Sequence, residues 1–363
     1  MHSNHVRIHQ RNASMTLSQE TILNSFLSDN LINYDELESK TIAEVYILSA
    51  FLKTACDYLK EQLWLIKNET HENHDTVSSF YTTAFQEDLK TLNFLKDILI
   101  SNKGSYKKTR KKALTMEHNA LNYIAKEPRT QRKTFLIKAL EEMSQFYNVE
   151  ERAQEGRLQS LGHNGPRLYR TFDNIDDLFN LNYTKELDIE FDPNEKERLY
   201  AGAGVGVQSG YSTILLALEN LNLSEGDRII DLGSGYGRVG LVYSLLRPDL
   251  EIIGYEFVSE RVDIANEAKN DLNLSDSLAF YAQDLSLDSF ELPIAEVYYL
   301  YDPFTAETYE YILNQIVEVS KKQKVTIVTK GNAREKLVAV SRKNGWPEPL
   351  LIDESNLCIF TSA

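Results

Sequence analysis

Cysteine is scarce in this chain, and only Cys56 and Cys358 occur among its 363 residues. Two cysteines cannot build the disulfide framework of a small secreted domain, so we expect a reducing compartment, the cytoplasm. The first 15 residues contain no apolar core of the kind that a secretory signal peptide needs. The longest mainly apolar stretch, residues 42–56, includes Glu44 and Lys53 and is too short to span a bilayer. The sequence therefore predicts a soluble protein.

Positive charge is also in short supply, since 39 Lys and Arg face 54 Asp and Glu, for a formal net charge of −15. A protein that wraps a nucleic acid backbone needs surplus cations, so this balance argues against that class. Most of the acidic excess lies in residues 195–363, which favours a cationic or neutral substrate there. The exception is a basic run in the first half, which either binds an anionic partner such as RNA or is a solvated loop and helix start. Its members are Lys103, Lys107, Lys108, Arg110, Lys111 and Lys112.

Histidine is absent from the second half, because the last of the seven histidines is His163. A histidine general base is therefore excluded from residues 195–363. The pairs His2/His5 and His71/His74 have a spacing that metal sites tolerate, but they lack the neighbouring cysteines or carboxylates of a real site. We expect no metal.

The periodicity of apolar residues divides the chain in two. From about residue 16 to 157, apolar side chains recur three or four positions apart, which is the spacing of one helix face. Three such stripes predict two long amphipathic helices, within residues 45–66 and 77–99, and a shorter one within 135–146. We expect a helical domain over residues 1–165, with 1–15 as a mobile tail, and its simplest interpretation is a bundle without chemistry of its own.

The second half alternates short strand-like runs with helix-length segments. The strands are expected at 228–231, 251–256, 278–282, 296–301, 324–329, 350–352 and 357–361, and the helices at 209–221, 237–246, 258–272, 306–321 and 333–344. This alternation predicts a doubly wound, mostly parallel seven-strand sheet with helices on both faces. The last two strands are too close together for a crossover helix and predict an antiparallel C-terminal hairpin. The expected fold class is α/β over residues 195–363, preceded by the all-α domain and a bridging segment at 166–194.

The most informative stretch joins the first strand to the next helix and reads Asp231-Leu-Gly-Ser-Gly235-Tyr-Gly. Glycines let the chain turn sharply and let a ligand approach main-chain N–H groups at a helix start. A G-x-G-x-x-G begins at Gly235, and Glu256 follows about 20 residues on, as in the dinucleotide fingerprint. However, Asp231 ends the strand, and a carboxylate at that point repels a pyrophosphate. It suits a ligand that carries an ammonium and a sulfonium group.

At these residues the chain resembles the class I S-adenosylmethionine-dependent methyltransferases, whose first motif is acidic–x–Gly–x–Gly–x–Gly. The resemblance covers roughly residues 195–363 and implies S-adenosyl-L-methionine as the cofactor. The binding residues that it implies are Asp231, Gly233, Ser234, Gly235, Gly237, Glu256 and Asp284. By this resemblance Asp231 organises the methionine end, Glu256 holds the ribose and Asp284 lies by the adenine.

A second glycine-rich segment, residues 200–210, precedes the first strand. In several subgroups of the family this segment folds over the methionine carboxylate, which makes Gln208 and Ser209 candidate donors and Tyr200 a candidate to close the site. The alternative is a flexible lid or a plain loop.

The fourth strand runs into Tyr301-Asp302-Pro303-Phe304, and in this family that edge faces the methyl group and the acceptor. The resemblance therefore makes Tyr301, Asp302 and Phe304 the candidate catalytic residues. Asp302 would accept a hydrogen bond from an amine or help to remove its proton. The alternative is a turn set by Pro303 with Phe304 in the core. Relatives that methylate adenine or glutamine carry a second proline here, which this chain lacks.

We therefore expect methyl transfer to an acceptor amine, most simply a protein side chain such as lysine. The alternatives are a small-molecule or RNA methyltransferase, or an interaction protein that binds the cofactor without catalysis. An RNA acceptor would need the basic run, through Lys107, Lys108, Arg110, Lys111 and Lys112.

Overall fold

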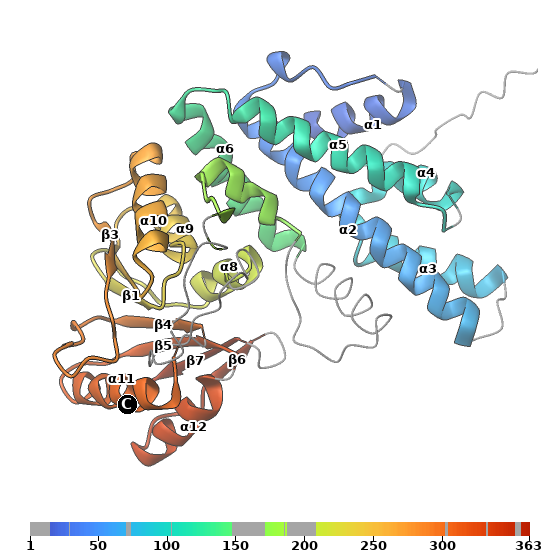
Figure 1. The fold of residues 1–363 in the computed structure, drawn as a ribbon. Coiled ribbons are helices and arrows are strands. Elements are labelled where there is room, and N and C mark those ends of the chain that lie inside the picture. Colours follow the sequence, from blue (N-terminus) through green and yellow to red (C-terminus); the bar gives the residue numbers. More distant parts are fainter. Residues whose placement is uncertain are drawn as a thin grey trace, which may run out of the picture.

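The structure is a computed structural model of the chain. It describes residues 15–28, 30–69, 74–102, 104–146, 171–184, 186, 208–301, 304–331, 333–352 and 357–363. Helices make up the first part of the described chain, and a twisted sheet flanked by helices makes up the second (Figure 1). None of the helices in the described part is long and apolar enough to cross a membrane.

The sheet has seven strands in the order β3-β2-β1-β4-β5-β7-β6. They are β1 (Arg228–Leu232), β2 (Glu251–Glu256), β3 (Leu278–Ala282), β4 (Val297–Tyr301), β5 (Thr326–Lys330), β6 (Leu350–Ile352) and β7 (Leu357–Thr361). Strands β1 to β5 pair in parallel, whereas β7 is antiparallel to both β5 and β6. This confirms the predicted mostly parallel sheet and its antiparallel hairpin.

Helices cover both faces of the sheet. Successive strand residues point to opposite faces, so neighbouring residues of one strand lie in different cores. Ile229 of β1 lies in the core that includes α8 (Tyr211–Glu219), α9 (Arg238–Leu246) and α10 (Ser259–Leu272). Its neighbour Ile230 lies in the core on the other face, under α11 (Ala306–Ser320) and α12 (Ala333–Lys343). Both isoleucines are fully buried, which explains why such strands read as short continuous apolar runs.

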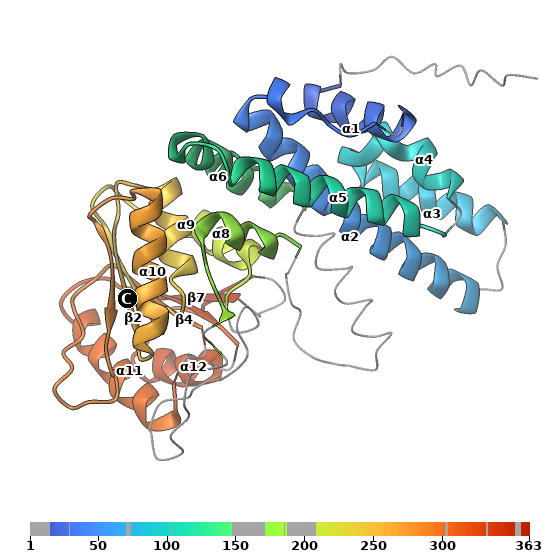
Figure 2. The same ribbon diagram turned by 45° about the horizontal axis from the view of Figure 1, so that its top comes forward.

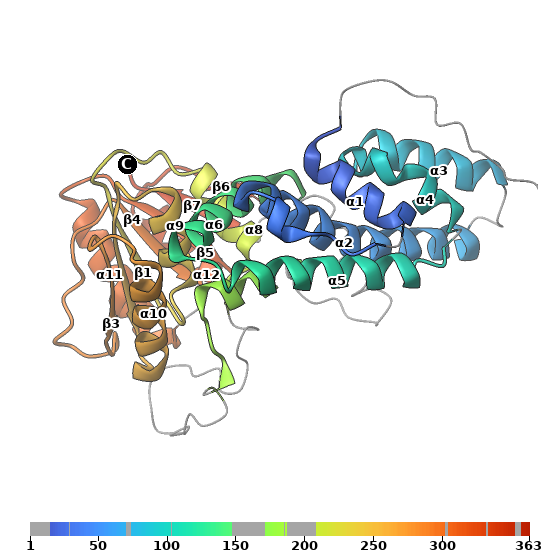
Figure 3. The same ribbon diagram turned by 90° about the horizontal axis from the view of Figure 1, so that it is seen from above.

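The helical part is built around α2, a helix of 31 residues. Its helices are α1 (Leu17–Ser28), α2 (Ser39–Glu69), α3 (His74–Gln86), α4 (Lys96–Ser101), α5 (Lys107–Ile124) and α6 (Arg129–Met143), with short 3-10 turns at Tyr34–Glu36, Lys90–Leu95 and Ser144–Phe146. Helix α5 lies along α2, and α6 packs against α8, α9 and α10 (Figures 2 and 3). One apolar core therefore runs from α2 through α6 to one face of the sheet.

The continuous helix predicted within residues 77–99 is wrong. Helix α3 ends at Gln86, and the 3-10 turn Lys90–Leu95 separates it from α4. The N–H of Leu89 bonds back to the carbonyl of Ala84 and the N–H of Leu92 to that of Leu89, so the chain first loosens and then tightens its helical winding. Leu89 and Leu92 are nevertheless fully buried. The stripe predicted burial correctly, but spacing alone does not require one unbroken helix.

The predicted domain boundaries remain a prediction. The expected connection at residues 161–166 lies outside the described residues, and so does most of the bridging segment. The described part of that segment contains the 3-10 turn Asp173–Phe179, whose apolar side chains join the core shared with α2 and α6.

Candidate functional site

Asp231 lies at the point where the strand order reverses. Strand β1 has β2 on one side and β4 on the other, and ligands of doubly wound sheets bind at the carboxyl ends of the strands beside such a reversal. The Asp231 side chain is 3% exposed, and among the described residues its Oδ2 atom has no hydrogen-bond partner. Burial, followed by the negative charge of Glu256, raises the pKa of Asp231 to about 8. A buried carboxyl with an unused oxygen is suited to receive a cation.

The glycine turn after Asp231 is held against the neighbouring strand. The N–H groups of Gly233 and Ser234 donate to the carbonyl of Tyr255 in β2, at 2.9 and 2.8 Å. The Oγ atom of Ser234 is buried and has no hydrogen-bond partner among the described residues. Two orphaned polar atoms, on Asp231 and Ser234, therefore lie on the same short turn, and an absent polar ligand is the simplest reason for both.

Gly235 and Gly237 both need the left-handed conformation, with φ of +55° and +78°. A Cβ on Gly235 would lie 2.9 Å from the amide nitrogen of Gln208, and one on Gly237 would lie 2.6 Å from the ring of Phe280. Glycine at 237 therefore permits close packing, whereas glycine at 235 leaves room beside Gln208, a predicted binding residue.

Glu256 braces the glycine turn. Its carboxylate accepts hydrogen bonds from the N–H groups of Gly235 (2.9 Å) and Val258 (3.1 Å), and Arg261 approaches it at 3.4 Å. A carboxylate has about four acceptor positions, so these contacts leave room for a ribose hydroxyl. The ribose role of Glu256 stays a prediction.

Asp284 is partly exposed beyond the end of β3. It accepts hydrogen bonds from the N–H (2.8 Å) and the hydroxyl (2.6 Å) of Ser286. These bonds fix the turn, and contact with an adenine stays a prediction.

The start of α8 brings Gln208 and Ser209 to the same edge. Both side chains are buried, and Gln208 lies against Gly235. Tyr299 of β4, which pairs with Asp231 of β1, donates a hydrogen bond to Ser209 Oγ at 3.3 Å. Tyr200 and the glycines at 202, 204 and 206 lie outside the described residues.

The predicted acceptor edge is described only in part. Asp302 and Pro303 lie outside the described residues. Tyr301 ends β4 and is half-buried, whereas Phe304 is buried and packs edge-on against Tyr309, with ring centroids 5.1 Å apart. That position gives Phe304 a packing role, and its contact with an acceptor stays a prediction.

The sequence reasoning missed Lys330, which pairs with Tyr301 at the end of β5. Its ammonium lies 5.1 Å from the centre of the Tyr301 ring and donates to Thr213 Oγ1 at 2.9 Å. The side chain is 4% exposed, so a cation is buried beside the candidate acceptor edge. A lysine directly after the strand predicted at 324–329 was the available signal.

Comparisons with known proteins match short stretches of proteins named as methyltransferases. No family model matches the chain. The ribosomal RNA small subunit methyltransferase G of Mycobacterium marinum is 40% identical over 53 residues, which are 15% of this chain and 23% of that protein. The protein of the same name from Acidothermus cellulolyticus is 47% identical over 49 residues, or 14% and 22% of the two chains. The match thus spans less than a quarter of the length of these relatives.

Solved structures with a similar fold include several methyltransferases. Precorrin-6y C5,15-methyltransferase from Geobacter metallireducens superposes with a TM-score of 0.35 at 15% identity, over 43% of this chain and 90% of that one. An RNA methyltransferase from Salinibacter ruber, in complex with S-adenosyl-L-homocysteine, gives a TM-score of 0.32 at 17% identity, over 43% and 92%. Scores and identities this low say nothing about substrate.

The strand order decides the fold. An order of 3-2-1-4-5-7-6 with β7 antiparallel, and with the acidic–x–Gly–x–Gly–x–Gly turn after β1, is the arrangement of one fold family. The carboxy-terminal part of the chain has the class I S-adenosylmethionine-dependent methyltransferase fold.

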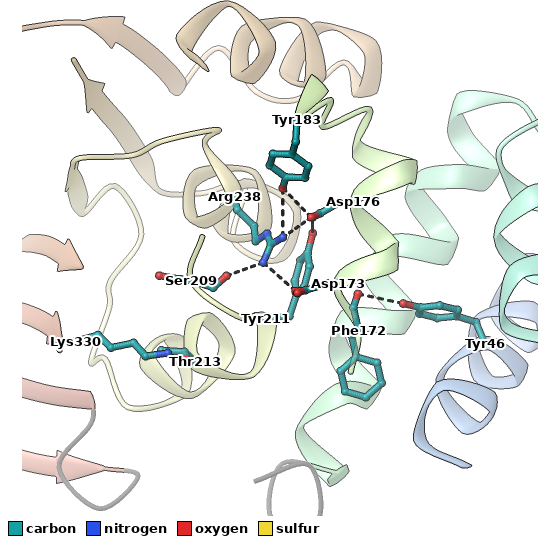
Figure 4. A network of polar contacts seen from close by, with 10 residues as sticks. All are labelled: Tyr46, Phe172, Asp173, Asp176, Tyr183, Ser209, Tyr211, Thr213, Arg238 and Lys330. Atoms are coloured by element: carbon teal, nitrogen blue, oxygen red, sulfur yellow. Dashed lines mark hydrogen bonds and ion pairs between the residues drawn. The ribbon is translucent and has the colours of Figure 1, made fainter. Parts of the chain in front are cut away.

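A buried arginine ties this methyltransferase fold to the bridging segment (Figure 4). Arg238 directly follows the glycine turn and is 1% exposed. It donates to Asp173 (3.1 Å), to the carbonyl of Ser209 (2.8 Å) and, by a short ion pair, to Asp176. Asp176 also accepts a hydrogen bond from Tyr211, at 2.5 Å. Arg238 therefore holds the glycine turn, the start of α8 and the bridging segment in one arrangement.

A second contact of the same kind lies beside it. Glu186 of the bridging segment accepts from the hydroxyl of Tyr236 in the glycine turn, at 2.6 Å, and forms a short ion pair with Arg261 of α10. All three side chains are buried. Nothing in the sequence pattern pointed to Arg238 or Glu186, because their partners are distant along the chain.

Proposed function

We propose that this chain transfers a methyl group from S-adenosylmethionine to an acceptor. The observation that carries the proposal is the buried Asp231 carboxyl, which has an unused oxygen, at the reversal of strand order; the same short turn carries the Ser234 hydroxyl, also unpartnered among the described residues. When bound, S-adenosylmethionine supplies an electrophilic methyl group on a positively charged sulfur.

The residues present fit such a cofactor. Asp231 offers a carboxylate to its ammonium group, and the desolvated position makes that attraction stronger than it would be in water. Gln208 lies against Gly235 and is a candidate donor to its carboxylate. A dinucleotide fits less well, because Asp231 would face its pyrophosphate. Transfer then requires mainly that the acceptor be aligned and water excluded.

The acceptor is better sought among RNA and small molecules than among protein lysines. The buried ammonium of Lys330 beside Tyr301 disfavours the approach of another protonated amine to this edge. The short but significant matches to proteins named as ribosomal RNA methyltransferases support the same choice. This choice of acceptor differs from the one expected from the sequence, which was an amine on a protein side chain.

Calorimetry with S-adenosylhomocysteine tests the proposal. We expect saturable binding to the wild type that is lost in Asp231→Asn, and no heat with NADH. Release of labelled methyl groups into an acceptor then separates an enzyme from a protein that only binds the cofactor. Absence of heat with S-adenosylhomocysteine would overturn the proposal.

A further inference from the structure

The helical part carries a group of exposed cations around an exposed tryptophan. We call this group the basic face, and it consists of Lys60, Trp64, Lys67, Lys107, Lys108 and Lys111. All six side chains are exposed, and Trp64 is 56% exposed. An aromatic ring exposed among cations offers a flat face on which a nucleic acid base can stack.

Two contacts show that α5 runs antiparallel to α2. Glu117 of α5 bonds to Lys53 of α2 at 2.7 Å, and Arg110, one to two turns nearer the start of α5, pairs with Asp57 at 3.0 Å. As the chain moves back along α5, its contacts therefore move forward along α2.

Continuing this register brings the two halves of the basic face together. A Cβ built on Gly104, just before α5, would lie 3.7 Å from Leu63 of α2. Residues three or four apart share one side of a helix, so Lys60, Trp64 and Lys67 continue the stripe that begins at Asp57. That stripe runs beside the first turns of α5, where Lys107 and Lys111 are exposed.

Helix stability does not explain the lysines at the start of α5. Helix α5 has no acidic residue in its first turn, and cations near the start of a helix oppose its macrodipole. Two other members of the basic run have structural contacts, since Arg110 pairs with Asp57 and Lys112 donates to the Ser25 carbonyl. Lys107 and Lys111, exposed at the unfavourable end of α5, point instead to a binding role.

We propose that the basic face binds single-stranded RNA, with its lysines at phosphates and the Trp64 ring stacked on a base. Cations with an exposed aromatic ring are the combination by which proteins hold unpaired nucleic acid. The formal net charge of the whole chain is −15 even with these lysines counted, so the rest of the surface repels phosphate and RNA is confined to this face. This inference rests on the proposed function in naming RNA as the acceptor, but RNA binding itself is measured without any cofactor.

The test uses the full chain and a fluorescein-labelled single-stranded RNA of 16 nucleotides, followed by anisotropy. We expect Lys107→Glu/Lys111→Glu to weaken binding by roughly tenfold or more, and to make the salt dependence shallower by about 1.4 in log–log slope, or about 0.7 for each lost phosphate contact. The matched control is Lys322→Glu/Lys343→Glu, two exposed lysines on the sheet domain, which should bind as the wild type does.

Trp64 provides an independent readout, because the chain has only one other tryptophan, Trp346, and that one is buried. RNA should quench the tryptophan fluorescence of the wild type but not that of Trp64→Phe, which should still bind. Trp64→Ala should bind roughly tenfold more weakly, as expected for loss of one stacked base.

Three results would overturn the inference. These are equal loss of binding in the control pair, unchanged binding in Trp64→Ala, and complete competition by heparin with no effect of Trp64, which would mark a general polyanion surface. If RNA fails to bind while S-adenosylhomocysteine still binds, the basic face is refuted and the proposed function stands. If S-adenosylhomocysteine fails to bind, the proposed function falls whatever the RNA result.

Discussion

Replacing Asp231 with asparagine should stabilise the ligand-free protein and abolish cofactor binding. The side chain is 3% exposed, and one of its oxygens has no partner among the described residues. Asparagine has nearly the same shape as a protonated aspartic acid but cannot ionise. The substitution therefore removes the cost of keeping an ionisable group buried, together with the charge that attracts a cation.

The size of the effect follows from the pKa, which rises from 3.8 to about 8 on folding. Below pH 3.8 the carboxyl is neutral in both states and the shift has no effect. As the pH rises from 3.8 toward 8, the unfolded chain loses its proton and the folded chain keeps it, so stability falls by about 1.4 kcal/mol per pH unit. At pH 7 the loss is roughly 4 kcal/mol, and above pH 8 it grows no further.

Thermal unfolding at pH 5 and pH 8, with and without S-adenosylhomocysteine, measures this. Ligand-free Asp231→Asn should melt above the wild type, by an amount that grows with pH at about 2–4 °C per kcal/mol for a domain of 150–250 residues. The ligand should raise the melting temperature of the wild type but not that of Asp231→Asn, because a ligand stabilises only a native state that binds it. Asp263→Asn, an exposed aspartate on α10, is the control and should behave as the wild type. Equal protection of Asp231→Asn by the ligand, or a difference in melting temperature that ignores pH, would refute the reasoning.

Three further outcomes are expected. The affinity for S-adenosylhomocysteine should rise as the pH increases from 6 toward 8, by up to about tenfold per pH unit. The reason is that Asp231 must release its proton before it can bind an ammonium group. Titration calorimetry measures the affinity, and a profile that does not change with pH would contradict this expectation. Gly235→Ala should weaken that binding, because its Cβ would lie 2.9 Å from the Gln208 amide, and it should cost about 1–2 kcal/mol in unfolding free energy, because alanine is strained at a φ of +55°. Denaturant unfolding measures this cost, and the circular dichroism spectrum checks the fold. Arg238→Met should cost about 3–5 kcal/mol in unfolding free energy, because it leaves Asp176 buried without its cation. Adding Asp176→Asn should restore part of that loss, and denaturant unfolding that shows no recovery would argue against a coupled pair.

The strands of the sheet were predictable to within two residues. The strand expected at 278–282 is β3 itself, and the one expected at 324–329 is β5, Thr326–Lys330. Buried parallel strands are short and apolar throughout, and turn residues bound them, so local composition marks them well. The prediction of one continuous helix within residues 77–99 was wrong, because a stripe of buried leucines is compatible with either a continuous or a broken helix.

The surroundings of the glycine turn were not predictable. Asp173 and Asp176 precede Arg238 by 65 and 62 residues, and no periodicity links such positions. The lysines at the start of α5 are visible in the sequence, but only the antiparallel packing of α2 and α5 brings the start of α5 alongside the last turns of α2.

The amino-acid sequence by itself determined the succession of strands and helices, the glycine turn and the acidic residue before it. These depend on backbone conformation and on burial over a few neighbouring residues. Only the tertiary structure decided that Asp231 keeps an unused oxygen, that Lys330 is buried beside Tyr301, and that Arg238 joins the bridging segment to the glycine turn. Whether a polar group finds a partner, and how far it is desolvated, depends on residues brought together from distant parts of the chain.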